Sequence, residues 1–532
     1  MHPTAAEPPF RTLPDLIREH AQARPRQRAL VQGEECLDYA ALDALMDRVA
    51  AALQRHGLQP GESIAICAQT SPRYAALFLG ALRAGVAVAP LAPSVTAAQF
   101  ASMFADSQAR LLFADASVLP LLGPDRLPTV ALDAAAPGTP LTDWLAPPGS
   151  RPAPVAIQPE WPFNIIYSSG TTGTPKGIVQ SHGMRWTHVL RGAAYGYGPQ
   201  AVTLLSTPLY SNTTLVVFVP TLAYGGTVHL MAKFDAAGYL KLAEAQRVTH
   251  TMLVPVQYQR LMALPDFDRH DLKSFHMKFC TSAPFSAALK ADVLKRWPGG
   301  LVEFYGMTEG GGTCILNAHE HPDKLHTVGR PAAGHDIRLI DEAGNELPPG
   351  EAGEVVGHSR GMMLGYHGQP QKTREAEWYD AGGKRFIRTG DIGRFDADGF
   401  LVLFDRRKDM VISGGFNIYP SDLEGVLRGH DAVVDVAVVG VPSAEWGETP
   451  VAYVVRRPGS DVTETALRDW CNARVGKTQR LAAVHLIDEL PRSAIGKVLK
   501  RELRERHVAG VAHDAGAGAG PGPVGRPPTP RR

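Results

Sequence analysis

Apolar residues in the first half of the chain follow two alternating spacings, one typical of strands and the other of helices. Short apolar runs predict strands, and the segments between most of them carry apolar residues at helical spacing. Because helical segments separate the strands, the pattern predicts α/β layering with largely parallel strands. The expected strands are residues 63–68, 110–114, 203–206, 227–230 and 250–254.

The longest apolar stretch covers residues 74–93 and is interrupted by Arg83 and by Gly80, Gly85 and Pro90. It is too short and too broken to span a bilayer. It predicts instead a buried helix over 74–84 followed by a strand over 86–88. No membrane span is expected.

The pattern changes after residue 336, where short strands over 337–340, 353–356 and 400–404 are separated by turn signals. This predicts a β-rich subdomain that completes a large N-terminal domain over residues 1–405. A charged run at 406–409 is the expected hinge. Residues 410–506, with strands over 433–441 and 450–455, predict a small mobile α+β domain. The Gly/Ala-rich and Pro/Arg-rich tail, residues 507–532, is expected to be disordered.

Composition narrows the class of protein. The chain has 532 residues, too many for one core, and a formal net charge of +1, which gives no reason to expect nucleic acid as a partner. Its five cysteines lie far apart with no C-x-x-C pair, which favours a reducing compartment over disulfides or a zinc site. The N-terminus resembles no signal peptide. We therefore expect a cytoplasmic protein, and a homodimer is an assembly that the sequence leaves open.

Residues 167–177 narrow the function most; they read Tyr-Ser-Ser-Gly-Thr-Thr-Gly-Thr-Pro-Lys-Gly. Such a loop can turn backbone N–H groups and hydroxyls around a polyanion, while Lys176 adds a point charge. Apolar runs at 163–167 and 178–179 predict that it joins two strands. A Walker loop instead needs Gly-Lys followed by Ser or Thr at a helix start. The alternative is a flexible Gly/Ser/Thr surface turn.

Five further segments follow in order. They are Tyr305-Gly306-Met307-Thr308-Glu309, Arg388-Thr389-Gly390-Asp391 ahead of a hairpin, the charged run with Arg406 and Lys408, Ser413-Gly414-Gly415-Phe416-Asn417-Ile418-Tyr419-Pro420, and Pro491-Arg492-Ser493-Ala494-Ile495-Gly496-Lys497. With the loop, they resemble the signature segments of adenylate-forming enzymes: acyl-CoA synthetases, peptide-synthetase adenylation domains and luciferases. The resemblance covers about residues 12–505 and is nearest to the acyl-CoA synthetase branch.

The resemblance implies a role for each matching residue. Thr171, Thr172 and Lys176 would hold the β,γ-phosphates of ATP, and Lys497 would bridge the carboxylate and the α-phosphate. Glu309 would bind Mg²⁺, and Asp391 would accept both ribose hydroxyls. The implied catalytic residues are Lys497, Glu309 and Thr172. The implied ATP/AMP-binding residues are Ser168, Ser169, Gly170, Thr171, Thr172, Gly173, Lys176, Ala283, Tyr305, Gly306, Thr308, Asp391 and Arg406.

The resemblance also implies a hinge at Lys408 and a tunnel for coenzyme A walled by Gly414, Gly415 and Phe416. The expected acyl pocket is lined by Tyr210, Ser211, Gly310 and Gly311. The family often has a histidine where this chain has Ser211, so how the acyl pocket closes is left open.

Each of these residues could also have a purely structural role. Asp391 could brace a hairpin, Glu309 could be a solvated acid, and Lys497 could be an exposed lysine; their joint occurrence in order favours the resemblance. The cluster His319-Glu320-His321, with His326, lacks the H-E-x-x-H spacing of a helical zinc site. We expect it to be a polar surface loop.

The resulting prediction is an acid–thiol ligase that uses ATP and Mg²⁺ to form acyl-AMP and then a CoA thioester. CoA is expected because too few residues follow Lys497 for a carrier domain. A freestanding ligase that loads a carrier protein is the alternative, ahead of a P-loop kinase or a non-catalytic relative. The segment 210–216 and Phe218 contain no arginine or lysine. A second carboxylate is therefore not expected on the acid, which leaves a medium- or long-chain fatty acid or a cinnamate-like aryl acid.

Overall fold

The computed structural model describes residues 8–122, 128–168, 176–406, 409–413, 416–443, 446–493 and 496–517. These residues form two compact units: a large one that extends to Leu403 and a small one that begins at Phe404. The division falls just ahead of the charged run in which the hinge is predicted. Lys408 itself lies outside the described residues.

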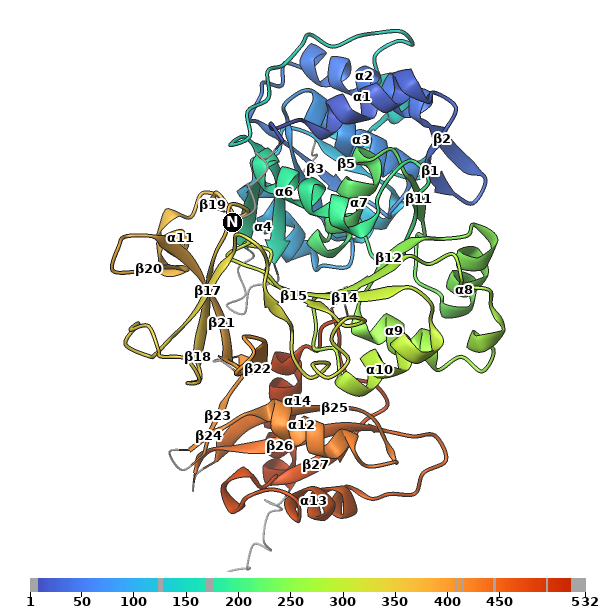
Figure 1. Cartoon of the computed structure of the whole chain (residues 1–532). Helices are drawn as coiled ribbons and strands as arrows, with labels where there is room; N and C mark the ends of the chain where they lie inside the picture. The colour runs from blue at the N-terminus through green and yellow to red at the C-terminus, as the bar shows by residue number, and fades with distance from the viewer. Residues whose placement is uncertain are drawn as a thin grey trace, which may run out of the picture. The chain divides into compact units, whose positions relative to one another are not determined.

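Two large sheets confirm the predicted α/β layering, with parallel strands at the centre of each and antiparallel strands at edges (Figure 1). The predicted strands belong to two sheets. In spatial order the first sheet contains β16 (Arg330–Pro331), β15 (Cys314–Asn317), β14 (Gly300–Tyr305), β13 (Met277–Cys280), β12 (His250–Leu253), β10 (Val202–Leu205), β11 (Thr227–Leu230), β1 (Arg28–Gln32) and β2 (Glu35–Asp38).

The second large sheet carries the strands on both sides of the Gly/Ser/Thr loop. Its strands, in spatial order, are β19 (Gly365–Tyr366), β9 (Lys176–Ser181), β8 (Pro162–Ser168), β4 (Ala87–Leu91), β3 (Ser63–Cys67), β5 (Leu112–Ala114), β6 (Thr129–Ala131) and β7 (Thr139–Pro140).

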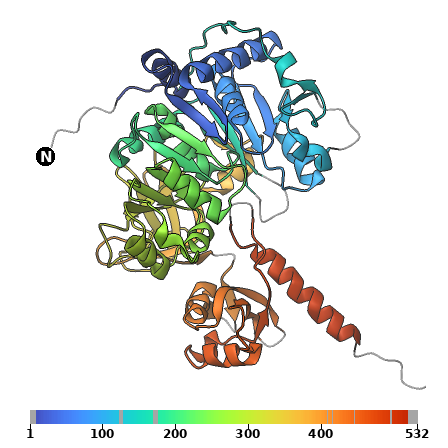
Figure 2. The same ribbon diagram turned by 90° about the vertical axis from the view of Figure 1, so that its right-hand side faces the viewer.

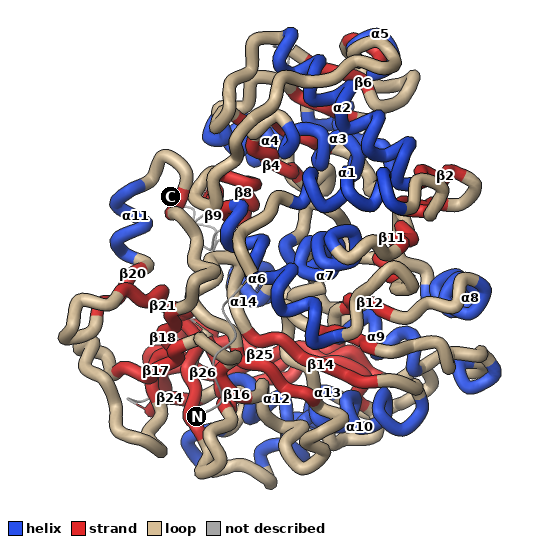
Figure 3. The backbone as a smooth tube through the Cα atoms, turned by 45° about the horizontal axis from the view of Figure 1, so that its top comes forward, coloured by secondary structure: helices blue, strands red, loops and turns tan. Residues whose placement is uncertain are grey.

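Helices pack between and over these sheets, and the largest apolar core joins α1, α2, α3, α6 and α7 to strands of both. In Figure 3, α6 and α7 lie side by side, as their direct contacts require. The helices of the large unit are α1 (Leu13–Ala23), α2 (Tyr39–Arg55), α3 (Pro72–Arg83), α4 (Ala97–Ser107), α5 (Leu141–Trp144), α6 (His182–Gly192), α7 (Asn212–Ala223), α8 (Ala236–Ala245), α9 (Pro255–Met262), α10 (Ala287–Arg296) and α11 (Pro370–Glu375), with 3₁₀ turns η1 (Ala116–Leu121), η2 (Ala193–Tyr195) and η3 (Phe267–Arg269).

The helix predicted over 74–84 is α3, and its start follows from local sequence. The Ser71 side chain accepts a hydrogen bond from the Tyr74 N–H at 3.2 Å, and Pro72 occupies the first turn, where its missing N–H costs nothing. All twelve residues of α3 are buried except Arg73. The apolar stretch is therefore a core helix.

A smaller antiparallel sheet confirms the predicted β-rich region. Its strands are β17 (Asp336–Ile340), β18 (Gly353–His358), β21 (Arg385–Phe395) and β20 (Glu377–Tyr379), with β22 (Leu401–Arg406) paired to β21. One expectation is corrected: Arg388 to Asp391 lie within β21 and do not precede the hairpin. Arg388 pairs with Val356 and Ile392 with Glu354, so β21 continues through the segment with a bulge between these two pairs.

The small unit is α+β, as predicted. Its sheet contains β24 (Phe416–Ile418), β23 (Val411–Ser413), β26 (Gly447–Arg456) and β25 (Val433–Ser443), with β27 (Ala483–Leu486) parallel to β26. Helices α12 (Pro420–Arg428), α13 (Glu464–Asn472) and α14 (Lys500–Ala517) and the 3₁₀ turn η4 (Lys477–Gln479) complete it.

The expectation of disorder from residue 507 is wrong in part, because α14 continues to Ala517 (Figure 2). The segment 507–517 contains four alanines, and alanine has the highest helix propensity. Residues 518–532 lie outside the described residues.

Candidate functional site

The two strands beside the Gly/Ser/Thr loop form an antiparallel pair in which Ser168 lies opposite Lys176. The prediction that the loop joins two strands is confirmed. The predicted phosphate-binding residues Ser169, Gly170, Thr171, Thr172 and Gly173 lie outside the described residues, as does the side chain of Ser168.

Lys176 and Glu309, far apart in the sequence, meet at Tyr366. The Lys176 ammonium lies 4.9 Å from the centre of the Tyr366 ring, and the Tyr366 hydroxyl donates a 2.8 Å hydrogen bond to Glu309 Oε1. Burial, and then the charge of Glu309, raises the pKa of Tyr366. The phenol therefore stays a donor that fixes the carboxylate, and the structure brings the loop lysine and the predicted metal ligand to one tyrosine.

Tyr305 and Asp391 also meet. The Tyr305 hydroxyl, at the end of β14, donates a 2.9 Å hydrogen bond to Asp391 Oδ2 in β21. Burial, and then the Asp391 charge, raises the pKa of Tyr305. The residues predicted to contact adenine and ribose are thus neighbours across two sheets of the large unit.

The segment containing Ala283 lies against the same strand end. The Thr281 hydroxyl donates to the Phe304 carbonyl at 2.8 Å, and the Ser282 hydroxyl shares a 2.6 Å hydrogen bond with that of Thr213 in α7. Ser282 has φ +81°, a conformation that costs energy for a residue with a Cβ atom. These contacts hold the two residues before Ala283 against β14 and the start of α7.

Ser211, at the position where the family often has histidine, begins a helix. Its hydroxyl accepts a 3.2 Å hydrogen bond from the Thr213 N–H and serves as the N-cap of α7. The side chain is buried. Tyr210 beside it is partly buried, and burial raises the pKa of its phenol.

Close packing explains why glycines follow Glu309. A Cβ atom at Gly310 would lie 1.9 Å from the Gly361 carbonyl oxygen, and one at Gly311 would lie 2.6 Å from the Ile387 Cβ. Gly310 also has φ +72°. A Cβ at Gly306 would meet the Gly312 carbonyl oxygen at 3.1 Å. That Gly310 and Gly311 line an acyl pocket stays a prediction.

A buried polar network, which the sequence reading missed, supports these segments. The Gln180 amide donates to the Thr308 carbonyl oxygen at 2.7 Å and accepts from the Asn164 amide at 2.9 Å. Gln180 also accepts from Arg185, which donates to Asn212 Oδ1 at 2.9 Å. Burial lowers the pKa of Arg185 to about 9. The sequence signal that could have indicated this network is the presence of polar side chains at core-facing positions of a strand and a helix.

A cavity lies between α6, α7, β13 and β14, one strand position from Tyr305. Four aromatic rings line it, and it also contains a cation, Arg191. None of the predicted acyl-pocket residues Tyr210, Ser211, Gly310 and Gly311 lines it, so the expectation of a neutral acyl pocket stays a prediction. The lining residues are His188, Arg191, Gly192, Tyr195, Tyr197, Val216, Val217, Pro220, Phe279 and Phe304.

In the small unit, Lys497 closes a turn. Its N–H donates to the Ser493 hydroxyl at 3.2 Å, and its carbonyl oxygen accepts from the Ser493 N–H at 2.8 Å. Phe416 begins β24 and pairs with Ser413. Gly414 and Gly415 lie outside the described residues, as do the side chains of Phe416 and Arg406.

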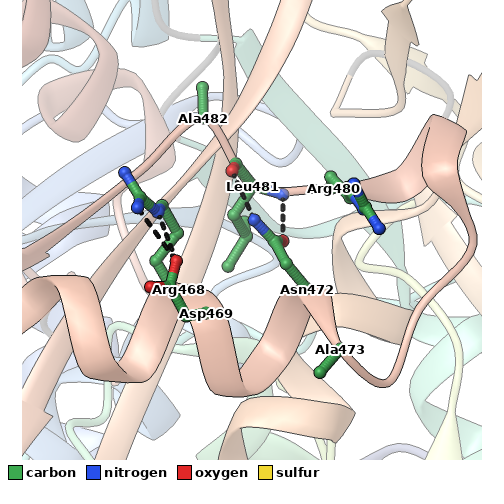
Figure 4. Close-up of a pocket in the computed structure, with 7 residues that line it drawn as sticks. All are labelled: Arg468, Asp469, Asn472, Ala473, Arg480, Leu481 and Ala482. Atoms are coloured by element: carbon green, nitrogen blue, oxygen red, sulfur yellow. Dashed lines mark hydrogen bonds and ion pairs between the residues drawn. The ribbon is translucent and has the colours of Figure 1, made fainter.

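A shallow hollow of about 510 Å³ lies between α13 and β27 (Figure 4). Its polar groups are largely paired within the unit, since Asn472 exchanges two hydrogen bonds with the Leu481 backbone and Arg468 pairs with Asp469. It contains none of the motif residues. The lining residues are Arg468, Asp469, Asn472, Ala473, Arg480, Leu481 and Ala482.

In the described part of the chain, no three His, Cys, Asp or Glu side chains are grouped so that they could hold a metal ion. His319 instead hydrogen-bonds the Leu301 backbone. No helix in these ranges has the length and apolar character needed to cross a membrane.

Comparison with known proteins gives two matching family models. Residues 17–367 match the model described as AMP-binding enzyme, and residues 422–497 match the AMP-binding enzyme C-terminal domain.

Similar proteins cover nearly the whole chain. A feruloyl-CoA synthase from Amycolatopsis sp is 34% identical over 91% of this chain and 97% of its own length. The fatty acid–[acyl-carrier-protein] ligase ScoC from Streptomyces coeruleorubidus is 31% identical over 94% and 97%. The crystal structure of ATP-bound MatB from Rhodopseudomonas palustris has a TM-score of 0.82 at 29% identity, covering 93% of this chain and 99% of that one.

Proposed function

Because this chain belongs to the AMP-binding enzyme family, and its relatives include acyl-CoA ligases, we propose that it joins an aryl carboxylic acid to coenzyme A in two steps. In the first, a carboxylate oxygen of the acid attacks the α-phosphorus of ATP, and the bond to pyrophosphate breaks. In the second, the CoA thiol loses its proton and attacks the acyl carbon, and AMP leaves.

The observation that carries this proposal is the meeting of the nucleotide motifs in the large unit. Tyr305 and Asp391 form one contact, and Lys176, Tyr366 and Glu309 form another. In our proposal Tyr305, Gly306 and Ala283 bind the adenine, and Asp391 and Arg406 bind the ribose. The phosphates are bound by Lys176, by Thr308 and by the loop residues Ser168 to Gly173, which include Thr172.

Glu309 suits a Mg²⁺ ion bound together with ATP. Mg²⁺ is commonly held by one or two carboxylates plus substrate phosphates, and Tyr366 fixes the Glu309 carboxylate beside Lys176. The ion would neutralise phosphate charge. Tyr366 orients the carboxylate, and Lys176 adds a positive charge near the same place.

Lys497 is proposed to bridge the attacking carboxylate and the α-phosphate. Two anions must approach each other in the first step, and a cation at that point lowers the barrier electrostatically. The turn closed by Ser493 fixes the backbone that presents this lysine.

Lys497→Ala tests the assignment. Acyl-AMP formation should fall by a factor on the order of 10² or more, while conversion of synthetic acyl-AMP and CoA to thioester should be largely retained. Lys477→Ala, an exposed lysine of the same unit, is the control and should keep both half-reactions. Near-normal acyl-AMP formation by Lys497→Ala would refute the role.

The second step needs a different arrangement, because the thiol enters only after pyrophosphate leaves. We assign Lys408 as the hinge and Gly414, Gly415 and Phe416 as the wall of the CoA tunnel. Lys408→Pro, which fixes φ near −65°, should form acyl-AMP but make thioester slowly. Wild-type thioester formation in a single-turnover measurement would remove the hinge from the proposal.

The similarity to a feruloyl-CoA synthase favours an aryl over a fatty acid in this proposal. Pyrophosphate release with cinnamate, benzoate and octanoate tests this, and a preference for octanoate would overturn it.

A carrier-protein thiol is the second candidate, favoured by the similarity to ScoC. With the preferred acid fixed, the enzyme is offered CoA or a holo acyl-carrier protein. We expect thioester on CoA. We also expect the enzyme to work in the cytoplasm, where the thiols of its five free cysteines would stay reduced.

A further inference from the structure

Asp106, in the last turn of α4, lies against the strand pair that carries Lys176. Its Oδ2 accepts a 2.7 Å hydrogen bond from the Tyr167 hydroxyl in β8. A Cβ atom at Gly177 in β9 would lie 3.0 Å from the same oxygen, so a side chain at that position would crowd the carboxylate. Tyr167 lies opposite Gly177 in the strand pair, and Gly177 directly follows Lys176. The carboxylate therefore contacts the strand pair one residue from Lys176.

The second oxygen of the same carboxylate contacts a third segment. Asp106 Oδ1 accepts a 3.2 Å hydrogen bond from the side-chain amide of Gln369, in the turn after β19. That turn is closed by the Gln369 N–H, which donates to the Tyr366 carbonyl oxygen at 3.1 Å. Each oxygen of Asp106 thus accepts from a different segment. The carboxylate joins the β8–β9 pair to the turn that begins at Tyr366, and we call this arrangement the Asp106 clamp.

The strand that carries Tyr366 has little backbone support of its own. β19 consists of two residues, and Tyr366 pairs with Ile178 of β9. Beyond the strand, the His367 N–H donates to the Gly177 carbonyl oxygen at 2.7 Å. So short a strand supplies few ladder hydrogen bonds, and the Asp106 clamp adds a side-chain anchor from α4.

The position of Asp106 has no explanation in the helix that carries it. The last turn of α4 has partial negative charge, which disfavours a carboxylate there. Within the described ranges Asp106 forms no ion pair, whereas Glu354, a buried acid of the same unit, pairs with Arg388. Burial, followed by the hydrogen bond to Asp106, raises the pKa of Tyr167, so the phenol stays a donor. The segments that Asp106 joins therefore account for its place.

The clamp relates two residues of the candidate nucleotide site. The Lys176 ammonium, from β9, lies 4.9 Å from the centre of the Tyr366 ring, and the Tyr366 hydroxyl donates to Glu309 at 2.8 Å. Because Asp106 joins the strand pair of Lys176 to the turn of Tyr366, it fixes these two residues relative to each other. Loss of the clamp would let them separate.

We propose that Asp106 is a positioning residue for ATP: its carboxylate joins the β8–β9 pair to the turn after β19 and so holds Lys176 where it binds the β- and γ-phosphates. This rests on the proposed function. Asp106 acts through Tyr167, Gly177 and Gln369 and needs no contact with the nucleotide. AMP lacks both of these phosphates, so the clamp should matter for ATP and not for AMP.

The test measures the equilibrium Kd of ATP and of AMP by titration calorimetry on the full chain. Asp106→Ala should raise the Kd of ATP at least about tenfold, because two hydrogen bonds to a carboxylate are lost. The Kd of AMP should stay at the wild-type value. A defect that merely loosened the fold would weaken both nucleotides together.

Tyr167→Phe breaks the clamp from its other side, since it removes the donor and keeps the ring. It should also raise the Kd of ATP and leave that of AMP unchanged. Added to Asp106→Ala, it should cause no further loss, because the two residues act through one hydrogen bond. If Asp106→Ala does not fold, Tyr167→Phe by itself decides the same comparison.

The matched control is Asp133→Ala, at a carboxylate of the same unit that accepts backbone N–H groups. Asp133 accepts from Ala116, Ala135 and Ala136 at 2.8–3.0 Å. This variant loses hydrogen bonds to a carboxylate, as Asp106→Ala does, but it should leave the Kd of ATP and of AMP unchanged.

The outcomes separate the two levels of inference. If the wild type binds neither nucleotide, or binds ATP but releases no pyrophosphate with any acid, the proposed function fails. If the wild type binds ATP and forms acyl-AMP, but the Asp106 and Tyr167 variants change neither Kd or change both by the same factor, the role of Asp106 fails while the ligase assignment stands.

Discussion

At the scale of single residues, the site depends on polar side chains that the motifs do not include. Gln180 is fully buried in β9 and joins three segments of the large unit. Its amide fixes the Thr308 carbonyl oxygen, and therefore the backbone that carries Thr308 and Glu309. A buried network of this kind stabilises the fold only while every member has a partner.

Gln180→Met tests that role. The substitution preserves volume but leaves the Thr308 carbonyl, the Asn164 amide and an Arg185 N–H without partners. We expect a loss of about 2 kcal/mol or more in the free energy of unfolding and a raised KM for ATP. Gln371→Met, at an exposed glutamine of α11, should change neither quantity. An unchanged melting temperature and ATP KM in Gln180→Met would show that the network is dispensable.

At the scale of elements, α14 shows how one helix can combine a packed start with an exposed continuation. Leu503 is fully buried in a core with Val439 and Val441 of β25, and its carbonyl oxygen accepts from the Tyr453 hydroxyl at 3.1 Å. Val508, one turn further on, is 54% exposed. The first turns thus hold the helix to the small unit.

Leu503→Ala should destabilise the small unit by about 3 kcal/mol, because it removes buried methyl groups and leaves a cavity. Val508→Ala on the same helix should cost no more than about 0.5 kcal/mol. Hydrogen exchange of β25 and β26 in the full chain measures the difference. Equal protection in the two variants would contradict the packing role of α14.

At the scale of the whole molecule, buried histidines couple stability to pH. Burial lowers the pKa of His182, His229, His250 and His335 to about 4. Between pH 6.5 and 4 the unfolded chain binds protons at these sites and the folded chain does not. The stability they contribute is therefore fully present above pH 6.5 and is lost as the pH falls toward 4.

His229 offers the clearest test, since its side chain is buried in β11. His229→Leu should make the fall of unfolding free energy between pH 6.5 and 4.5 shallower, by up to about 1.4 kcal/mol per pH unit. His326→Leu, at an exposed position, should keep the wild-type slope. Parallel profiles for wild type and His229→Leu would show that His229 does not contribute.

Much of the architecture follows from short-range patterns. The strand at 227–230 coincides with β11, and the alternation of apolar runs and helical segments gave the α/β layering. Such patterns are readable because a strand or a helix imposes its period on neighbouring residues. The motifs are readable for the same reason, since each is a continuous segment whose order alone indicated the family.

What only the tertiary structure decided is which distant side chains meet. Arg191 reaches the cavity because α6 packs against α7 over β13 and β14, and nothing in the residues next to it in sequence indicates this. Ser211 is a helix cap and Gly310 a point of close packing, roles set by their partners Thr213 and Gly361. The sequence by itself therefore determined the nucleotide chemistry, whose residues lie in continuous motifs. The lining of the cavity between α6 and α7 is a property of packing between elements, so it required the fold.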